Sequence, residues 1–241
     1  MKISYLFLFL SLLAEVVGTV GGFGSSVFFV PIANFYFDFY SVLGLTVLFH
    51  LSSNLSKLFL FHRGIDPMLI IYIGIPSVVF AIIGSVTSKF IDDIILEICL
   101  GVTLVLISSV FILVKNLVIK PNKRNSFLGG LVSGFSAGLL GTGGAIRGLT
   151  LASFNLEKTI FVSTSAVIDL AIDISRSSVY YSNGYIHGHD LIYVPFLIVI
   201  GLAGTYIGKR ILRHISQDRF RQISLMLVLF IGLITLLKQV L

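Results

Sequence analysis

Long apolar stretches separated by short polar loops occupy the chain from end to end. They cover residues 3–20, 25–37, 41–61, 68–88, 94–115, 127–140, 145–154, 160–181, 189–208 and 222–240. Several reach the roughly 18–20 apolar residues that a helix needs to cross a bilayer. The pattern predicts an all-α membrane protein, folded as a polytopic helical bundle whose outer faces meet lipid.

Two of these stretches, 25–37 and 145–154, are too short to cross the bilayer. As helices they would extend about 20 and 15 Å, at about 1.5 Å per residue. Each follows a glycine cluster, Gly18-Thr-Val-Gly-Gly-Phe-Gly24 in one case and Gly138-Leu-Leu-Gly-Thr-Gly-Gly144 in the other. We therefore expect two re-entrant hairpins, each broken by a glycine bend that a half-helix follows.

The two halves of the chain carry matching landmarks at an offset of about 120 residues. Beyond the glycine clusters, the matches are His50, Asn54 and Lys57 with Asp169, Asp173 and Arg176, Pro76 with Pro195, and Gly84 with Gly204. These matches predict a first membrane repeat over 1–115, a polar linker over 116–126 and a second membrane repeat over 127–241.

The distribution of Lys and Arg among the loops favours inverted repeats. With re-entrant hairpins each half has three crossings, and the linker side then holds eleven basic residues against three on the other side. The eleven are Arg63, Lys115, Lys120, Lys123, Arg124, Lys158, Lys209, Arg210, Arg213, Arg219 and Arg221. Four crossings per half would give parallel repeats and a split of seven to seven. The positive-inside rule therefore predicts a multi-pass protein of the bacterial inner membrane, with a cytoplasmic linker and both termini outside.

Composition agrees with this assignment and removes other classes of protein. Hydrophobic residues make up 56% of the chain and charged residues 12%, against about 25% charged in soluble domains. The net charge of +6 comes mostly from loops beside apolar spans, which indicates membrane topology and anionic lipid, and not nucleic acid. Cys99 is the only cysteine, so no internal disulfide and no cysteine metal site can form. Glu15 interrupts the first apolar run, and no cleavage site follows, which is typical of a mature helix and not of a signal peptide.

Two glycine bends related by symmetry would meet near the middle of the membrane. A glycine backbone can approach a ligand closely, and a helix that begins after the bend points its free N–H groups and positive dipole end at it. The candidate anion-binding residues of the bends are Gly21, Gly22, Gly24, Gly141, Thr142, Gly143 and Gly144. The alternative is that these glycines only allow helices to pack closely.

Polar and charged side chains inside apolar spans form a second candidate group, because an embedded charge costs about 2.5–3.5 kcal/mol and needs a partner or a wet cavity. Arginine's forked donors suit a sulfonate, a sulfite or a carboxylate. The side chains expected to contact an anion or to orient those that do are Asn54, Lys57, Arg147, Asp173 and Arg176. The alternatives are an internal ion pair between Asp173 and Arg176, and a Lys57 side chain that reaches the interface.

Acidic and histidine side chains in the spans are candidates for coupling transport to a proton or a sodium ion. Glu15, His50 and Asp169 belong to this group, since each can change its charge inside a protein. Each could equally be a structural partner of a basic residue.

Other chemistry is expected to be absent. His187-Gly-His189-Asp190 looks like a small metal cluster, but its place in a short loop is more typical of a hydrated interface, so we expect neither a metal nor another cofactor. We also find no Ser/His/Asp constellation on facing spans, no HExxH and no phosphate loop, so no catalytic residues and no enzyme activity are expected.

The motifs as a set resemble those of the sulfite exporter TauE/SafE family. The resemblance is carried by Gly21-Gly-Phe-Gly24 through Val30-Pro31, by Gly141-Thr-Gly-Gly144, by Thr46 to Asp66, and by Gly143 to Arg147 through Asp173 to Arg176. It covers nearly the whole chain. It implies two inverted membrane repeats and the export of sulfite, a sulfonate or a related sulfur-containing or organic anion.

The leading hypothesis is therefore a secondary transporter of a small anion that works by alternating access. One alternative is a proton- or cation-coupled carrier that uses the embedded acids, with the basic residues structural. A second is a membrane scaffold that transports nothing. Oligomeric state is not predicted by the sequence.

Overall fold

The computed structural model describes residues 4–21, 24–61, 64–114, 120–152, 154, 156–212, 214 and 217–238. Every regular element within these ranges is a helix. The prediction of an all-α fold is thereby confirmed for the described part of the chain.

The first half of the chain contains two helices that form a hairpin and three longer helical segments. Its elements are α1 (Tyr5–Gly21), α2 (Ser26–Ala33), α3 (Phe39–Leu60), α4 (Pro67–Leu69), the π-helix η1 (Ile70–Gly74), α5 (Ile75–Ser88) and α6 (Asp93–Leu113). Side chains fix several of these beginnings: the carboxylates of Asp38, Asp66 and Asp92 accept hydrogen bonds from the first free N–H groups of α3, α4 and α6.

The second half repeats this order of elements. It contains α7 (Lys123–Leu140), α8 (Gly144–Ala152), α9 (Lys158–Asn183), the 3-10 helix η2 (Asp190–Tyr193), α10 (Val194–Leu212) and α11 (Gln217–Lys238). Gly141 and Gly184 end α7 and α9 in the left-handed conformation, at φ 76° and 80°. The short helices α2 and α8, of 8 and 9 residues, lie where the sequence predicted half-helices.

The π turn at the start of the third long segment was not predicted. Pro76 has no N–H to continue the regular ladder, so one turn before it widens and the Ile75 N–H donates to Ile70 O. The chain still runs as one apolar segment from Pro67 to Ser88.

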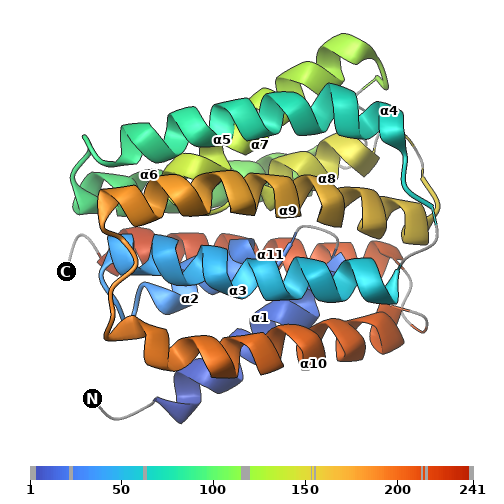
Figure 1. Ribbon diagram of the computed structural model, residues 1–241. Helices are drawn as coiled ribbons and strands as arrows, with labels where there is room; N and C mark the ends of the chain where they lie inside the picture. Colours follow the sequence, from blue (N-terminus) through green and yellow to red (C-terminus); the bar gives the residue numbers. More distant parts are fainter. Residues whose placement is uncertain are drawn as a thin grey trace.

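The helices lie side by side, and their turns gather at two ends of the bundle (Figure 1). Both termini lie at one end, together with the turns between α2 and α3, α5 and α6, and α9 and η2 (Figure 1). The turns between α3 and α4, α6 and α7, α8 and α9, and α10 and α11 lie at the opposite end. The hairpin of α1 and α2 enters from the end that holds the termini, and the hairpin of α7 and α8 enters from the other.

Packing pairs the helices of one half with those of the other. Helix α1 packs on α10 and α5 packs on α7, while α3 packs on α9 and α6 on α11. Exchanging the two halves, so that α1 stands for α7 and α5 for α10, leaves this set of pairs unchanged. The corresponding helices α3 and α9, and likewise α6 and α11, therefore pack directly against each other.

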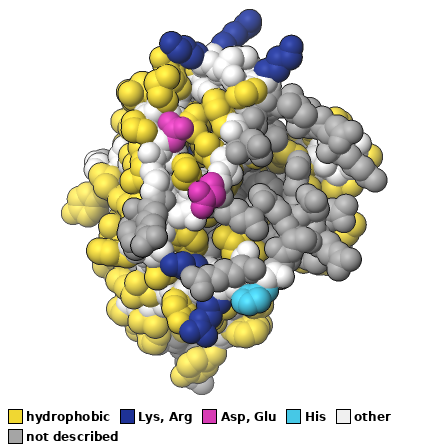
Figure 2. Space-filling model, turned by 90° about the vertical axis from the view of Figure 1, so that its right-hand side faces the viewer, with side chains coloured by type: hydrophobic (Ala, Val, Ile, Leu, Met, Phe, Trp, Pro, Cys, Tyr) yellow, Lys and Arg dark blue, Asp and Glu magenta, His cyan; other side chains and the backbone are white. Residues whose placement is uncertain are grey.

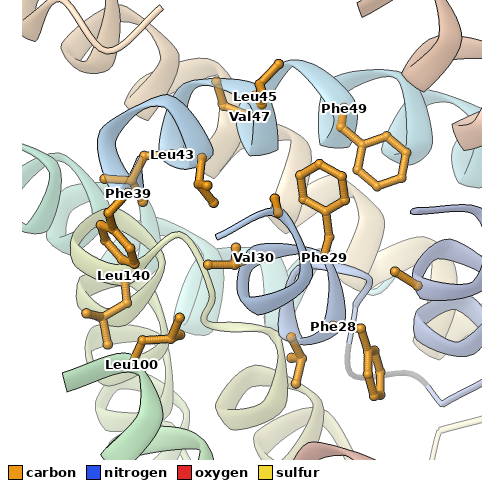
Figure 3. Packing of buried hydrophobic residues seen from close by; sticks show 14 of the residues in the cluster. Phe28, Phe29, Val30, Phe39, Leu43, Leu45, Val47, Phe49, Leu100 and Leu140 are labelled. Carbon is orange, nitrogen blue, oxygen red and sulfur yellow. The ribbon is translucent and has the colours of Figure 1, made fainter. Parts of the chain in front are cut away.

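The half-helix α2 lies inside the protein and not against lipid. Seven of its eight residues are buried, Ile32 being the exception. Phe29 points toward Phe49 of α3, with ring centroids 4.6 Å apart, and Val30 points away from that pair, as Figure 3 shows.

Four helical segments of the described chain are long and apolar enough to cross a membrane: Phe39–Leu60, Pro67–Ser88, Asp93–Leu113 and Asp190–Leu212. Tyr5–Gly21 and Leu225–Lys238 are shorter apolar helices. Large apolar side chains such as Ile82 and Ile98 point outward. This surface matches lipid and identifies a multi-pass membrane protein.

Close packing of α5 against α7 depends on glycine, which generates a first prediction. A Cβ atom on Gly134 would lie 2.1 Å from Ser77 O of α5. We expect Gly134→Ala to lower the free energy of unfolding by at least about 1–3 kcal/mol, because the helices must move apart. Denaturant unfolding in detergent would measure this. The control is Gly188→Ala, where an added Cβ would meet nothing within 4 Å; equal stability of the two variants would disprove the close approach.

Candidate functional site

The glycine bends of the two halves meet inside the bundle. Gly24 has φ +80°, and a Cβ atom placed on it would lie 3.9 Å from Gly144 Cα and 3.8 Å from Arg147 Nη2. Gly24 immediately precedes the turn into α2, and Gly144 is the first residue of α8. The beginnings of both half-helices therefore lie together, next to a guanidinium group.

The beginnings of α2 and α8 supply hydrogen-bond donors at this point. The first amides with local acceptors are those of Phe28 and Phe29, which donate to Ser25 O, and that of Arg147, which donates to Gly143 O. The earlier N–H groups of each helix have no acceptor within the helix, as at any helix beginning. Two such helix ends and one arginine make a local environment that favours an anion.

Arg147 and Asp169 form the first embedded ion pair. Arg147 Nη1 and Nη2 bind the two carboxylate oxygens of Asp169, and its Nε donates to Ser165 Oγ at 3.1 Å. The Arg147 side chain is 1% exposed, whereas that of Asp169 is 18% exposed. This pair is therefore more accessible to solvent than the Asp173–Arg176 and Glu15–Lys57 pairs described below. Its two parallel contacts have the bidentate geometry that an oxyanion would also use with an arginine.

Asp173 and Arg176 form the second embedded pair, one turn apart on α9. Arg176 Nη2 lies 2.7 Å from Asp173 Oδ1, and its Nη1 donates to Ala137 O at 2.7 Å. Asn54 Nδ2 of α3 donates to Asp173 Oδ2 at 2.8 Å. The guanidinium thus holds the end of α7 just before the second bend, and Asp173 joins α9 to α3 across the halves.

His50 connects the first bend to the same network. Its Nε2 lies 3.1 Å from Ser25 Oγ and its Nδ1 lies 3.9 Å from Asp173 Oδ2. Because Ser25 directly precedes α2, the imidazole joins the start of the first half-helix to the carboxylate on α9.

Glu15 and Lys57 form the third pair. Lys57 Nζ lies 3.0 Å from Glu15 Oε1, which also accepts hydrogen bonds from Thr19, Ser53 and Thr205. The Lys57 side chain is only 9% exposed, so the alternative in which it reaches the interface is wrong. This cluster joins α1 and α3 to α10 of the other half.

The remaining predicted residues of the two glycine bends contribute to the shape of the bends. Gly143 lies so close to α7 that an added Cβ would be 1.9 Å from Ser133 O, and Thr142 O accepts a hydrogen bond from Ser136. Gly21 is the last residue of α1, while Gly22 lies outside the described residues. Whether any of these residues binds a substrate stays a prediction.

Sequence reasoning missed the hydroxyl partners of the charged groups. Ser25, Ser53, Ser165 and Thr205 each contact one of the embedded polar or charged side chains. Serine and threonine are frequent in membrane helices and usually bond to their own backbone, so their positions alone carried no signal.

The loop of His187, His189 and Asp190 lies away from this network, at the end of the bundle that holds the termini (Figure 1). The expected hydrated loop is only partly observed. His189 is exposed, but Asp190 retains just 3% of its accessible surface.

The similarity to known proteins extends over nearly the whole chain. The family model described as "Sulfite exporter TauE/SafE" matches residues 7–235. The chain belongs to the sulfite exporter TauE/SafE family. It is also similar to a probable membrane transporter protein of Methanocaldococcus jannaschii, with 24% identity over 255 residues, covering 96% of this chain and 95% of the relative. The resemblance seen in the sequence is thereby confirmed, and this TauE/SafE protein is a member of a membrane transporter family.

The buried Glu15–Lys57 pair generates a second prediction. Lys57→Met leaves a carboxylate uncompensated in the bundle, and we expect it to reduce the free energy of unfolding by about 3–5 kcal/mol. Adding Glu15→Gln should restore most of this loss, since an amide oxygen still accepts from the three hydroxyl groups. Unfolding of both variants in detergent measures the difference. Lys89→Met, at an exposed lysine, is the control and should change little. A double variant no more stable than Lys57→Met would argue against the pair.

Proposed function

We propose that this protein is a secondary transporter of a small anion of the sulfite or sulfonate kind, acting by alternating access. One observation carries the proposal: Gly24, Gly144 and the Arg147 guanidinium lie together where two half-helices begin. In this arrangement the anion accepts hydrogen bonds from the free amides at the two helix beginnings and from Arg147. The family model's description supports the substrate class.

Arg147 cannot serve the anion and Asp169 fully at the same time. In the structure both Nη atoms of Arg147 bind the Asp169 carboxylate. We propose that the anion displaces this carboxylate and that a proton on Asp169 assists the displacement. Asp169 then acts as the coupling group. Anion and proton bind cooperatively, because a proton on Asp169 weakens its ion pair with Arg147 and so favours the anion, while an anion on Arg147 displaces Asp169 and so favours the proton.

Glu15, Lys57, Asp173 and Arg176 take a positioning role in this proposal. Their hydrogen bonds and ion pairs are directed at one another and at the backbone of α7, so they hold α3, α9 and the second bend in place. His50 and Asn54 extend the same network to the first bend. These residues act on the anion through the bends and through Arg147.

Alternating access follows from two inverted repeats, 1–115 and 127–241, joined by the linker 116–126. The packing pairs support this symmetry, because exchanging the halves preserves them. The two hairpins also enter from opposite ends of the bundle (Figure 1). Rocking of one repeat against the other would open the shared site to each side in turn.

The end of the bundle away from the termini is proposed to face the cytoplasm of a bacterial cell. Figure 2 looks at this end and shows Lys and Arg side chains at its top and toward its bottom, beside apolar surface. The described basic residues at this end include Lys120 before α7, Lys123 and Arg124 at the start of α7, and Lys209 and Arg210 in the last turn of α10. A membrane potential that is negative inside then favours anion export, by about 2.3 kcal/mol per charge per 100 mV.

Removing the guanidinium tests the site directly. In liposomes that contain the purified protein, we expect Arg147→Gln to reduce sulfite flux at least about tenfold, the equivalent of about 1.4 kcal/mol of lost interaction. Arg210→Gln removes an exposed arginine on α10 and should leave flux unchanged. Parental flux in Arg147→Gln, with the protein correctly inserted, would remove Arg147 from the site.

The proposed competition between the anion and Asp169 predicts a pH dependence. A sulfonate keeps one charge across the neutral range, and its affinity for the parent protein should rise as the pH falls, because protonation of Asp169 frees Arg147. Asp169→Asn should bind the sulfonate more tightly at high pH and lose this dependence. Equilibrium binding in detergent measures both effects. A pH dependence that persists unchanged in Asp169→Asn would exclude Asp169 as the coupling group.

A cation-coupled carrier remains the second candidate, favoured by one observation. Glu15 Oε2 is buried and has no hydrogen-bond partner among the described residues. A proton or a sodium ion could satisfy this oxygen. Flux that follows the pH or sodium gradient but is the same for every anion would support this function over anion binding at the bends.

A further inference from the structure

Three potential metal ligands converge where α9 is followed by η2. His187 Nδ1 lies 3.5 Å from Asp190 Oδ2, and His189 Nε2 lies 3.2 Å from Asp190 Oδ1. One ligand atom from each of the three residues lies within 4.8 Å of the others. The imidazole rings stand nearly parallel, with centroids 5.3 Å apart, on the side of the carboxylate that the solvent can reach.

The carboxylate of Asp190 gives an independent indication of a ligand. The residue retains 3% of its accessible surface, and neither carboxylate oxygen has a hydrogen-bond partner in the described structure. The two histidine nitrogens lie beside these oxygens without the geometry of a hydrogen bond. A buried carboxylate whose oxygens accept no hydrogen bond is costly, so this one is expected to bind a cation.

Each nitrogen–oxygen distance is close to the spacing of two ligands on a tetrahedral ion. Two ligands that each lie about 2.0–2.1 Å from zinc in tetrahedral geometry are about 3.3–3.4 Å from each other. His189 Nε2 lies 3.2 Å from Asp190 Oδ1 and His187 Nδ1 lies 3.5 Å from Asp190 Oδ2, so each histidine has this spacing to one of the two carboxylate oxygens. Two imidazoles and one carboxylate suit zinc or a neighbouring transition metal, whereas calcium and magnesium prefer oxygen ligands throughout.

We propose that His187, His189 and Asp190 bind a divalent transition-metal ion, with zinc as the type case. Three protein ligands leave the fourth position for water or another small ligand. The site revises the expectation, drawn from the sequence, of a hydrated loop without metal. It is separate from the anion site, and neither proposal depends on the other.

The metal site would join two parts of the bundle. Helix η2 packs on α3, and His187 Nδ1, which lies 2.8 Å from Ser41 Oγ in the first turn of α3, would exchange that hydrogen bond for the ion. An ion bound by the three ligands would fix the turn between α9 and α10 beside the beginning of α3. Helices α3 and α9 carry the network of His50, Asn54 and Asp173, so the ion would restrain two helices that position the proposed anion site.

Zinc binding to the purified full-length protein tests the proposal. Cys99→Ser in every sample removes the exposed thiol as a competing ligand. Isothermal titration with zinc should show one ion per chain, and cobalt should give the visible absorption of a tetrahedral site with nitrogen and oxygen ligands. His189→Gln and Asp190→Asn should each weaken zinc binding by at least about 10–100-fold, the loss that even an outer-shell partner causes.

The control is His214→Gln, an exposed histidine after α10 at the opposite end of the bundle, which should bind zinc like the parent. His189 is itself exposed, so its variant should fold even if Asp190→Asn does not. Zinc affinity that is equal in His189→Gln and the parent would overturn the proposal, as would a cobalt spectrum typical of an octahedral aqua ion.

Discussion

Every charge inside this bundle has to be paired, and the arrangement of the helices depends on that constraint. Lys57, Arg147 and Arg176 are each less than a tenth exposed and each contacts an acid. An isolated charge at membrane depth would cost several kcal/mol, so removing one partner penalises the other. The Glu15 cluster joins α1, α3 and α10, and the Asp173 cluster joins α3, α7 and α9. Both clusters cross from one half of the chain to the other.

Glycine supplies the second requirement, which is close approach of backbone to backbone. The Gly134 contact brings α7 against α5, and Gly24 and Gly144 bring the two bends together. A Cβ atom on Gly134 would force α7 away from α5, whereas Gly24 is required for its φ of +80° and not for space. Close packing is also seen at Gly143 of the second bend, so packing does not exclude the proposed anion site, although the sequence analysis treated the two as alternatives.

The apolar pattern and the glycine clusters were sufficient to predict the longer helices and the two short helices α2 and α8. They could not predict the π turn, because it depends on which neighbouring turn adapts to Pro76. The embedded charges were also identified, but only the Asp173–Arg176 pair was foreseen, since its spacing lies within one helix. Arg147 meets Asp169, and Lys57 meets Glu15, only after the hairpins fold back on the longer helices. Asp190 was misjudged for a similar reason: its burial is set by the bundle and not by its own loop.

In this TauE/SafE protein the arginine of the proposed anion site, Arg147, forms an ion pair with an acid of the same protein. The Arg147 guanidinium is already paired with Asp169, so in the proposed function the anion exchanges places with the Asp169 carboxylate. Such an exchange offers a physical reason why binding and a change of conformation could be linked, because the released carboxylate needs a new partner or a proton.

The position of the bound anion tests this account most directly. Selenite has the shape of sulfite and scatters anomalously, so crystals of the protein grown with selenite would locate it. We expect an anomalous peak within hydrogen-bond reach of the Arg147 guanidinium and the beginnings of α2 and α8, with the Asp169 carboxylate displaced. A peak elsewhere in the bundle, with the Arg147–Asp169 pair intact, would contradict it.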